Sequence, residues 1–202
     1  FPEVDIQIAN YFYNHELGFL YKKNIIVQLL YKSIPLITKI FAIACLLYMV
    51  YLYIKHKKFK LILNSAAFFL FFSAIIGPGF IVNTVLKDNF GRARPEQIKE
   101  FNGNKKFTKA FIITDQCKKN CSFSSGHAAM GFYFTAIAYT AGALYFTRIY
   151  LLGITFGILV GLSRIIMGGH FASDVVISGL IVLLINQLIF ICWNKKRLES
   201  TE

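Results

Sequence analysis

Residues 129–167, AMGFYFTAIAYTAGALYFTRIYLLGITFGILVGLSRIIM, decide the fold class of this 202-residue chain. Arg148 lies between two apolar runs, 129–147 and 149–167, and an apolar run of about 18 or more residues is long enough to span a bilayer as a helix. Every backbone polar group in a bilayer needs an internal partner, so both runs are expected to be helices rather than open strands. The single residue between them predicts a tight helical hairpin.

Three further apolar runs extend this pattern along the chain. Hydrophobic residues make up 56% of the sequence, which is too high for an ordinary soluble domain and indicates a membrane protein. We therefore predict one all-α domain over residues 1–202, built as a polytopic membrane helical bundle. The five predicted spans are residues 34–54, 62–86, 129–147, 149–167 and 174–193.

The segment before the first predicted span has a different character. Residues 1–33 mix aromatic side chains, such as Tyr11 and Phe12, with charges, and this mixture is typical of an amphipathic segment at the membrane interface. A solvated leader is the alternative that stays open. Because the chain starts at Phe1 without an initiator Met, we expect a processed or trimmed form that has lost an upstream segment.

Charge patterning indicates a topology rather than a nucleic-acid partner. The net charge is +12, but basic residues beside membrane spans more often set orientation or contact anionic lipid. The basic stretches 55–60 and 195–197 are expected on the cytoplasmic side, and the four crossings between them agree with that. Three polar clusters then share the opposite, outer face: KDNFGRARP at 87–95, SSGH at 124–127 and SRIIMGGHFASD at 163–174.

The four cysteines divide between the spans and the outer loop 87–128. Cys45 and Cys192 lie in or beside apolar runs and are expected to be small core residues. Cys117 and Cys121 lie in the loop, where a disulfide would suit an oxidising compartment. A zinc site is disfavoured because no further Cys or His lies close enough to complete four ligands, while a pair of free thiols stays open.

Lys87, Arg94 and Arg164 are the cations that could hold a phosphate group at the outer face. Cleavage of a phosphate ester without a metal needs fixed positive charge, and arginine offers two parallel hydrogen bonds to phosphate oxygens. Lys87 and Arg94 are seven residues apart, so they share a helix face if the helix continues to Pro95. Taken alone, ordinary snorkelling at the end of a span explains both residues better.

Ser125, Gly126 and His127 come directly before an apolar run that is predicted to be helical. Free backbone N–H groups at a helix N-terminus bind anions, and a glycine there allows close approach of the phosphate. The same residues could be a simple helix cap with Ser125 as the N-cap. The histidine favours a site, because His127 could protonate a leaving oxygen.

His170 and Asp174 are four residues apart, which places them on one side of a helical turn. A carboxylate bonded to one imidazole nitrogen would fix the tautomer and present the other nitrogen as a nucleophile. A surface histidine, with Asp174 as an N-terminal helix charge, is the alternative. The nearby Arg164 favours the catalytic interpretation.

In these three polar clusters the chain resembles the type-2 phosphatidic acid phosphatase superfamily, whose signature is K-x6-R-P, P-S-G-H and S-R-x5-H-x3-D. Order and internal spacing agree, and Ser124 stands where the family has proline, a position that shapes a turn. The matching residues are Lys87, Arg94, Pro95, Ser125, Gly126, His127, Ser163, Arg164, His170 and Asp174.

The resemblance implies a bundle of about six spans with its active site at the outer face, so one span would precede Phe1. It implies His170 as the nucleophile that forms a phosphohistidine, His127 as the general acid and Asp174 as the residue that orients His170. Phosphate would be held by Lys87, Arg94, Ser125, Gly126 and Arg164, with no metal, cofactor or obligatory protein partner.

The stretch NCSFSSGHAAMGF and the opening FPEVD are similar to bacterial lipid A phosphatases. They favour lipid A as the substrate, with the 1- or the 4′-phosphate removed, in a bacterial inner membrane with the site facing the periplasm. Undecaprenyl pyrophosphate and phosphatidylglycerophosphate are the competing substrates. A membrane protein that binds anionic lipid without catalysis is the alternative of another class.

Overall fold

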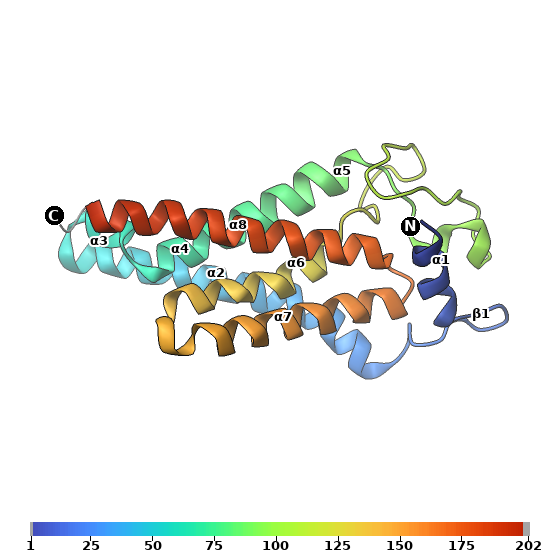
Figure 1. The fold of residues 1–202 in the computed structure, drawn as a ribbon, viewed down its shortest axis with the longest axis horizontal. Helices are drawn as coiled ribbons and strands as arrows, with labels where there is room; N and C mark the ends of the chain where they lie inside the picture. The colour runs from blue at the N-terminus through green and yellow to red at the C-terminus, as the bar shows by residue number, and fades with distance from the viewer. Residues whose placement is uncertain (1, 200–202) are drawn as a thin grey trace.

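In the computed structural model, which describes residues 2–199, the long helices run along one axis and form an elongated bundle (Figure 1). The predicted all-α membrane fold is therefore confirmed. Within the described range, four helical segments are long and apolar enough to cross a membrane. They are α2 (Ile25–His56), the continuous pair α4 (Ala66–Ala74) and η1 (Ile75–Leu86), α7 (Ala143–Ile166) and α8 (Ala172–Glu199).

The third predicted span, 129–147, ends earlier in the structure than predicted, at Thr140. Its residues form most of α6 (Gly126–Tyr133), the 3₁₀-helix η4 (Phe134–Thr140), the turn that follows and the start of α7, and the pair of α6 and η4 is not among the four long spans. The hairpin exists, but its turn lies at Gly142 rather than at Arg148. Gly142 has φ +80°, a conformation that glycine adopts without a steric penalty, and Arg148 lies exposed inside α7.

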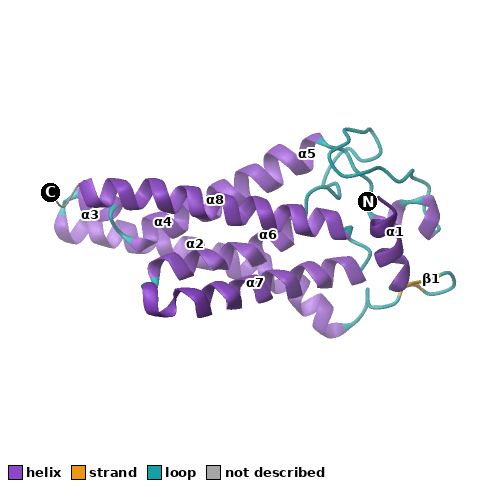
Figure 2. Ribbon diagram, viewed as in Figure 1, coloured by secondary structure: helices purple, strands orange, loops and turns teal. Residues whose placement is uncertain are grey.

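The first span begins at Ile25 rather than at residue 34. Asn24 caps α2 with its side chain, which accepts hydrogen bonds from the backbone N–H groups of Ile26 and Val27. Before it lie α1 (Pro2–Tyr11) and a short antiparallel hairpin of β1 (Tyr13–Asn14) and β2 (Gly18–Phe19). These elements lie at the end of the bundle where most of the loops gather (Figure 2).

The second predicted span, 62–86, is broken near its start and widened in its second half. Ser65 separates α3 (Phe59–Leu63) from α4, and its side chain caps α4 by accepting from Phe68 N–H at 3.2 Å. The second half of the span, around Pro78, is the π-helix η1, whose hydrogen bonds close five-residue turns. Asn83 Nδ2 donates to the Pro78 carbonyl at 2.6 Å and so satisfies an oxygen within the widened turns.

The outer loop contains short helical turns and a covalent link. After α5 (Lys87–Asn89) come the 3₁₀ turns η2 (Pro95–Gln97) and η3 (Lys99–Phe101), and then irregular chain up to α6. A disulfide joins Cys117 to Cys121, with the two Cα atoms 5.6 Å apart. The loop lies at the same end of the bundle as α1 and the hairpin (Figure 1).

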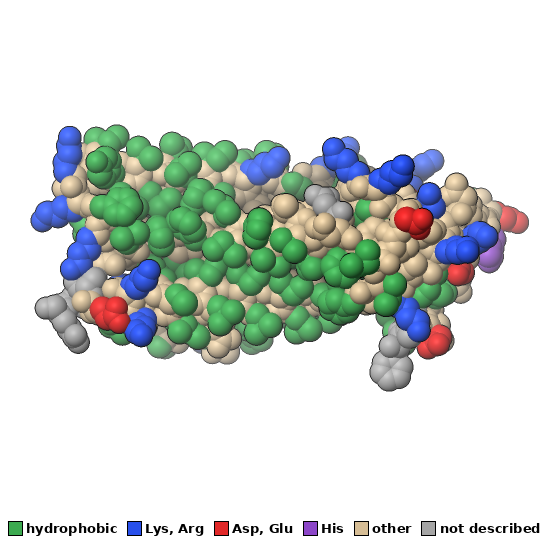
Figure 3. Space-filling view, turned by 90° about the horizontal axis from the view of Figure 1, so that it is seen from above, with side chains coloured by type: hydrophobic (Ala, Val, Ile, Leu, Met, Phe, Trp, Pro, Cys, Tyr) green, Lys and Arg blue, Asp and Glu red, His purple; other side chains and the backbone are tan. Residues whose placement is uncertain are grey.

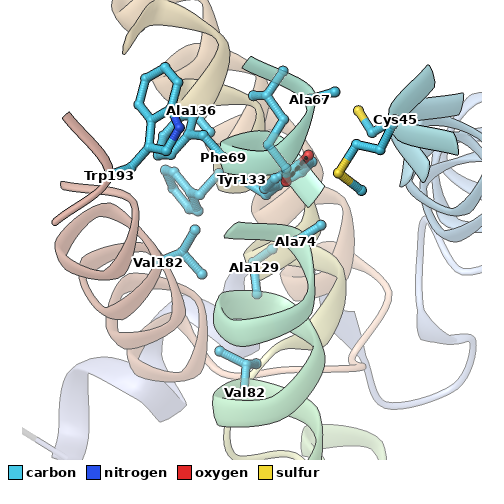
Figure 4. Packing of buried hydrophobic residues seen from close by; sticks show 14 of the residues in the cluster. Cys45, Ala67, Phe69, Ala74, Val82, Ala129, Tyr133, Ala136, Val182 and Trp193 are labelled. Carbon is cyan, nitrogen blue, oxygen red and sulfur yellow. Dashed lines mark hydrogen bonds between the residues drawn. The ribbon is translucent and has the colours of Figure 1, made fainter. Parts of the chain in front are cut away.

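The core of the bundle is aromatic and close-packed. Phe69 of α4 stacks on Trp193 of α8, and Tyr133 of α6 lies between α4 and α8 (Figure 4). Both polar tips are satisfied, because Trp193 Nε1 donates to the Leu63 carbonyl at 2.8 Å and the Tyr133 hydroxyl donates to the Leu70 carbonyl at 2.9 Å. Hydrophobic side chains cover the middle of the visible surface, and Lys and Arg gather mainly toward the two ends (Figure 3).

Candidate active site

The three polar clusters meet at one end of the bundle, as their sequence positions predict. Gly126 starts α6, Arg164 lies in the last turn of α7, and His170 and Asp174 lie on either side of the start of α8. The backbone N–H of Ser125 donates to the Asp174 carbonyl at 3.3 Å, which ties the second cluster to the third. His127 is close enough to Lys87, Arg164 and His170 for their charges to act on it.

His170 is fully buried and held through one ring nitrogen. Its Nδ1 lies 2.7 Å from the Ser122 carbonyl and 3.7 Å from Asp174 Oδ2. The carbonyl can only accept, so this contact places the proton of the neutral ring on Nδ1 and leaves Nε2 with its lone pair. Nε2 is buried with no hydrogen-bond partner among the described residues, as a nucleophile awaiting a substrate would be. Asp174, which the sequence predicts to orient His170, lies 3.7 Å from Nδ1, and the Ser122 carbonyl makes the shorter contact with the same nitrogen.

The surroundings of His170 keep it neutral. The pKa of His170 is lowered to about 4, mainly by burial and further by the positive charges of Arg164 and Lys87, against the raising influence of Asp174. The imidazole is therefore uncharged at neutral pH, which is the form that can attack an electrophile.

Asp174 is fully buried and connects α8 to the outer loop through hydrogen bonds. It accepts hydrogen bonds from Ser122 Oγ at 2.5 Å, from Arg92 Nη1 at 2.5 Å and from the Phe171 N–H at 2.9 Å. These contacts fix Ser122, whose carbonyl holds His170. Asp174 is therefore connected to His170 in two ways: through Ser122, and through its own carboxylate 3.7 Å from Nδ1.

Arg92 is a site residue that sequence reasoning missed. Its guanidinium is 1% exposed and lies 4.3 Å from the centre of the Phe171 ring. It pairs with Asp174 and, through Nη2 at 2.8 Å, with Asp5 of α1. Asp5 also accepts hydrogen bonds from the N–H and Oγ of Ser173 at 2.9 and 2.5 Å. Two features of the sequence could have indicated Arg92: the first cluster contains a second arginine beside Arg94, and a buried Asp174 needs a cation as its partner.

His127 makes its closest contacts with a residue of α2 that the sequence did not indicate. Its Nε2 lies 3.1 Å from the Tyr31 carbonyl, and its ring stacks on the Tyr31 ring with centroids 4.7 Å apart. The Arg164 guanidinium lies 4.3 Å from the centre of the same Tyr31 ring. The pKa of His127 is lowered to about 3, mainly by burial and then by the charges of Arg164, His170 and Lys87, against the raising influence of the Tyr31 carbonyl.

The cations of the candidate site come from different structural elements. Arg164 is 3% exposed, and its Nε has no hydrogen-bond partner among the described residues. Lys87 is also largely buried, at the start of α5. The helix does not continue from Lys87 to Pro95 as predicted: α5 ends at Asn89, and Gly91 turns the chain with φ +62°. A Cβ at Gly91 would lie 1.8 Å from the Thr114 carbonyl oxygen, so only glycine fits there.

Arg94 therefore extends from the loop rather than from a helix face. Its Nε and Nη2 donate to the Asn120 carbonyl at 3.2 and 2.9 Å. Asn120 lies between Cys117 and Cys121, so the disulfide-closed loop positions Arg94. Its charge acts on Arg164, which places the two guanidinium groups in the same region.

The second cluster combines capping with site formation. Ser125 is the N-cap of α6, and its Oγ lies 3.4 Å from the Ala128 N–H that it caps. The glycine at 126 has a packing role as well, because a Cβ there would lie 2.2 Å from Asn83 Oδ1. Ser124, which replaces the proline of the family signature, is buried and its Oγ has no partner among the described residues. Within the described range, no group of three His, Cys, Asp or Glu residues could hold a metal ion.

Comparison with known proteins places this geometry in a family. Residues 66–198 match the PAP2 superfamily. The chain is 36% identical over 213 aligned positions to the lipid A 4′-phosphatase of Francisella tularensis subsp. novicida (strain U112), with 98% of this chain and 89% of that protein covered. It is 37% identical over 112 positions to the lipid A 4′-phosphatase of Rhizobium leguminosarum, which covers 55% of this chain and 48% of that protein. No solved structure matches the chain. The family match and the near full-length relative together show that the chain belongs to the PAP2 superfamily.

Proposed function

We propose that this chain is a membrane phosphatase that removes the 4′-phosphate of lipid A through a phosphohistidine at His170. The observation that carries the chemistry is the buried, neutral His170, whose Nε2 has no partner among the described residues and lies among cations. The choice of lipid rests on the relatives, because the aligned proteins from Francisella and Rhizobium are lipid A 4′-phosphatases.

Binding would begin with the phosphate group. Arg94 and Arg164 can each give two hydrogen bonds to its oxygens, and Lys87 adds a point charge. The N-terminus of α6 adds backbone N–H donors at Gly126 and His127 and the hydroxyl of Ser125. These donors are fixed before the substrate arrives, so they can stabilise the charge that develops on the phosphoryl oxygens in the transition state.

The first chemical step would transfer the phosphoryl group to the enzyme. The lone pair of His170 Nε2 forms a bond to phosphorus while the bond from phosphorus to the sugar oxygen breaks. His127 donates a proton to that oxygen, so the dephosphorylated lipid leaves as a neutral alcohol. The ring of His170 gains positive charge, which the carboxylate of Asp174 at 3.7 Å stabilises, while the proton stays on Nδ1 and is donated in a hydrogen bond to the Ser122 carbonyl.

The second step would return the enzyme to its starting state. Water attacks the phosphorus of the phosphohistidine, His127 accepts a proton from that water, and the bond from Nε2 to phosphorus breaks. His127 has to be protonated for the first step although its pKa is about 3 without substrate. A phosphate dianion opposes the positive charges that lower this pKa, so substrate binding itself favours the protonated acid.

We further propose that the protein lies in a bacterial inner membrane with the site facing the periplasm. The basic residues of the 55–60 and 195–197 stretches lie at the end of the bundle opposite the site, where short basic loops mark the cytoplasmic side. The disulfide near Arg94 suits an oxidising compartment.

The test is phosphate release by the purified protein in detergent. Lipid A, undecaprenyl pyrophosphate, phosphatidylglycerophosphate and phosphatidic acid are offered side by side, with His170→Ala as the control. We expect preference for lipid A, loss of activity in the control, and a product that keeps its 1-phosphate when analysed by mass spectrometry. Equal turnover of all four lipids would replace the proposal with a broad lipid phosphatase. No turnover by a folded protein would favour a lipid-binding role.

A further inference from the structure

A hollow lies at the same end of the molecule as the candidate phosphate site, outside the apolar part of the bundle (Figure 1). It is a cavity of about 640 Å³ between the β1–β2 hairpin and the η2–η3 turns, and we call it the hairpin pocket. Its volume is in the range of cavities that hold small molecules. Its walls include Tyr13, Lys22, Glu96 and Asn102, and its rim includes the exposed side chains of Leu17 and Leu20.

The hairpin pocket shares its inner wall with the catalytic turn. The backbone N–H of Glu96 donates to the Gly168 carbonyl at 3.1 Å. The ring of Phe19 packs against the Cα of Gly168, so closely that a Cβ there would lie 2.3 Å from the ring. Gly168 belongs to the turn between Arg164 and His170, so residues of the pocket wall contact the turn that connects these two residues.

The pocket has a fixed aromatic surface. Tyr13 is half-buried, and its ring lies 4.9 Å from the ring of Phe101 and 5.1 Å from that of Phe19, centre to centre. Phe101 and Phe19 are themselves buried, so they hold Tyr13 in place while part of its ring stays accessible. A rigid ring of this kind offers an apolar face to the C–H groups of a sugar at little entropic cost.

Polar groups surround that ring. Glu96 Oε2 accepts a hydrogen bond from Lys22 Nζ at 2.5 Å in an ion pair, and Asn102 Nδ2 donates a hydrogen bond to the His15 carbonyl at 3.1 Å. A carboxylate, an ammonium and an amide beside one aromatic face can bind the hydroxyl and amide groups of a sugar ring. They fit an acyl chain poorly, because such a chain would leave these groups without their water. Leu17 and Leu20 at the rim could contact the acyl part of the same lipid.

We propose that the hairpin pocket binds the sugar headgroup of a phosphoglycolipid whose phosphate lies in the catalytic site. The proposal rests on the proposed function and deepens it, because the pocket would be the part of the enzyme that distinguishes a glycolipid phosphate from a glycerolipid phosphate. Tyr13 supplies the stacking surface and Glu96 fixes the orientation of the sugar through its hydroxyl groups.

The direct test measures binding without turnover. Lipid A from which both phosphates have been removed is titrated into the wild-type protein in detergent. Tyr13→Leu keeps an apolar side chain but removes the ring, and Tyr13→Phe keeps the ring as the matched control. We expect the dissociation constant to rise about three- to tenfold in Tyr13→Leu and to stay within about twofold in Tyr13→Phe. Equal affinity in all three proteins would overturn the proposal.

A kinetic comparison separates recognition from a structural effect. With Tyr13→Leu and Glu96→Gln, we expect a several-fold rise in KM for lipid A, little change in kcat, and unchanged hydrolysis of phosphatidic acid, which has no sugar. Parallel losses on both lipids would show that the changes act on the fold and would overturn the proposal. If the wild type hydrolyses phosphatidic acid but not lipid A, the proposed function fails, and the binding titration still decides whether the pocket recognises a sugar.

Discussion

Replacing Arg92 by leucine should destabilise this protein more than any other single loss of charge near the site. The guanidinium donates to Asp174 and Ser173 through Nη1, to Asp5 through Nη2 and to the Thr108 carbonyl through Nε, at 2.5 to 2.9 Å. Arg92→Leu keeps apolar contact with Phe171 but leaves two carboxylates buried without a cation. Neither carboxylate can reach water, since Asp5 is 5% exposed and Asp174 is 0% exposed.

The size of the effect follows from that burial. Removing one partner of a buried ion pair costs about 3–5 kcal/mol, because the remaining charge loses its compensation. For a chain of this size, each kcal/mol shifts the melting temperature by about 2–4 °C, so we expect a fall of about 6–20 °C. Arg94→Leu is the matched control: this half-buried residue contacts a carbonyl, Asn120 O, and its loss should cost about 1 kcal/mol.

The assay is thermal unfolding of the purified proteins in one detergent, followed by circular dichroism at 222 nm. The double variant Asp5→Asn with Arg92→Leu removes one of the two stranded charges and should be more stable than Arg92→Leu alone. A fall of less than about 3 °C in Arg92→Leu, or an equal fall in Arg94→Leu, would refute the buried network. If the stability loss of the double variant equals the sum of the losses in Asp5→Asn and in Arg92→Leu, the coupling between Asp5 and Arg92 is refuted.

Three further expectations concern activity. Protonated His170 cannot attack phosphorus, so kcat/KM should fall as the pH drops through about 4, the pKa of the free enzyme; constant kcat/KM down to pH 3 would argue against His170 as the nucleophile. Tyr31→Leu should lower kcat/KM about tenfold because His127 and Arg164 lose the ring between them, whereas Tyr31→Phe should stay near the wild type; similar values for both variants would exclude a role for the ring. Reduction of the disulfide, or Cys117→Ser, should raise KM by loosening the loop that positions a phosphate-binding arginine, with unchanged KM as the contrary result.

The sequence predicted what depends on composition and on short spacings. The apolar runs indicated the helices, and the number of crossings between the polar clusters indicated that His127, Arg164, His170 and Asp174 share one end of the bundle. What it missed depends on contacts between distant segments. The carbonyl of Ser122 and the ring of Tyr31 lie beside the two histidines because of tertiary packing, and no local pattern marks a backbone oxygen or an aromatic residue as part of a site.

The boundaries of elements were the other source of difference. Arg148 looked like the turn of a hairpin because it is the charged residue between two apolar runs, yet the turn lies at Gly142. The backbone at 142 requires a positive φ, and a long basic side chain is tolerated inside a helix near the membrane surface, where its charge can extend to water. In the same way, Gly91 ended a helix that the spacing of Lys87 and Arg94 seemed to continue.

The contact between Asp5 and Ser173 has a consequence for how the protein is made. The two residues are 168 positions apart in the chain. At a synthesis rate of roughly 5–20 residues per second, roughly 8–34 s pass between their emergence from the ribosome. During that interval α1 carries a carboxylate whose partners, Arg92 and Ser173, arrive in turn. The contacts that close the end of the bundle with the candidate site therefore wait for Ser173, which is synthesised after helices α2 to α7.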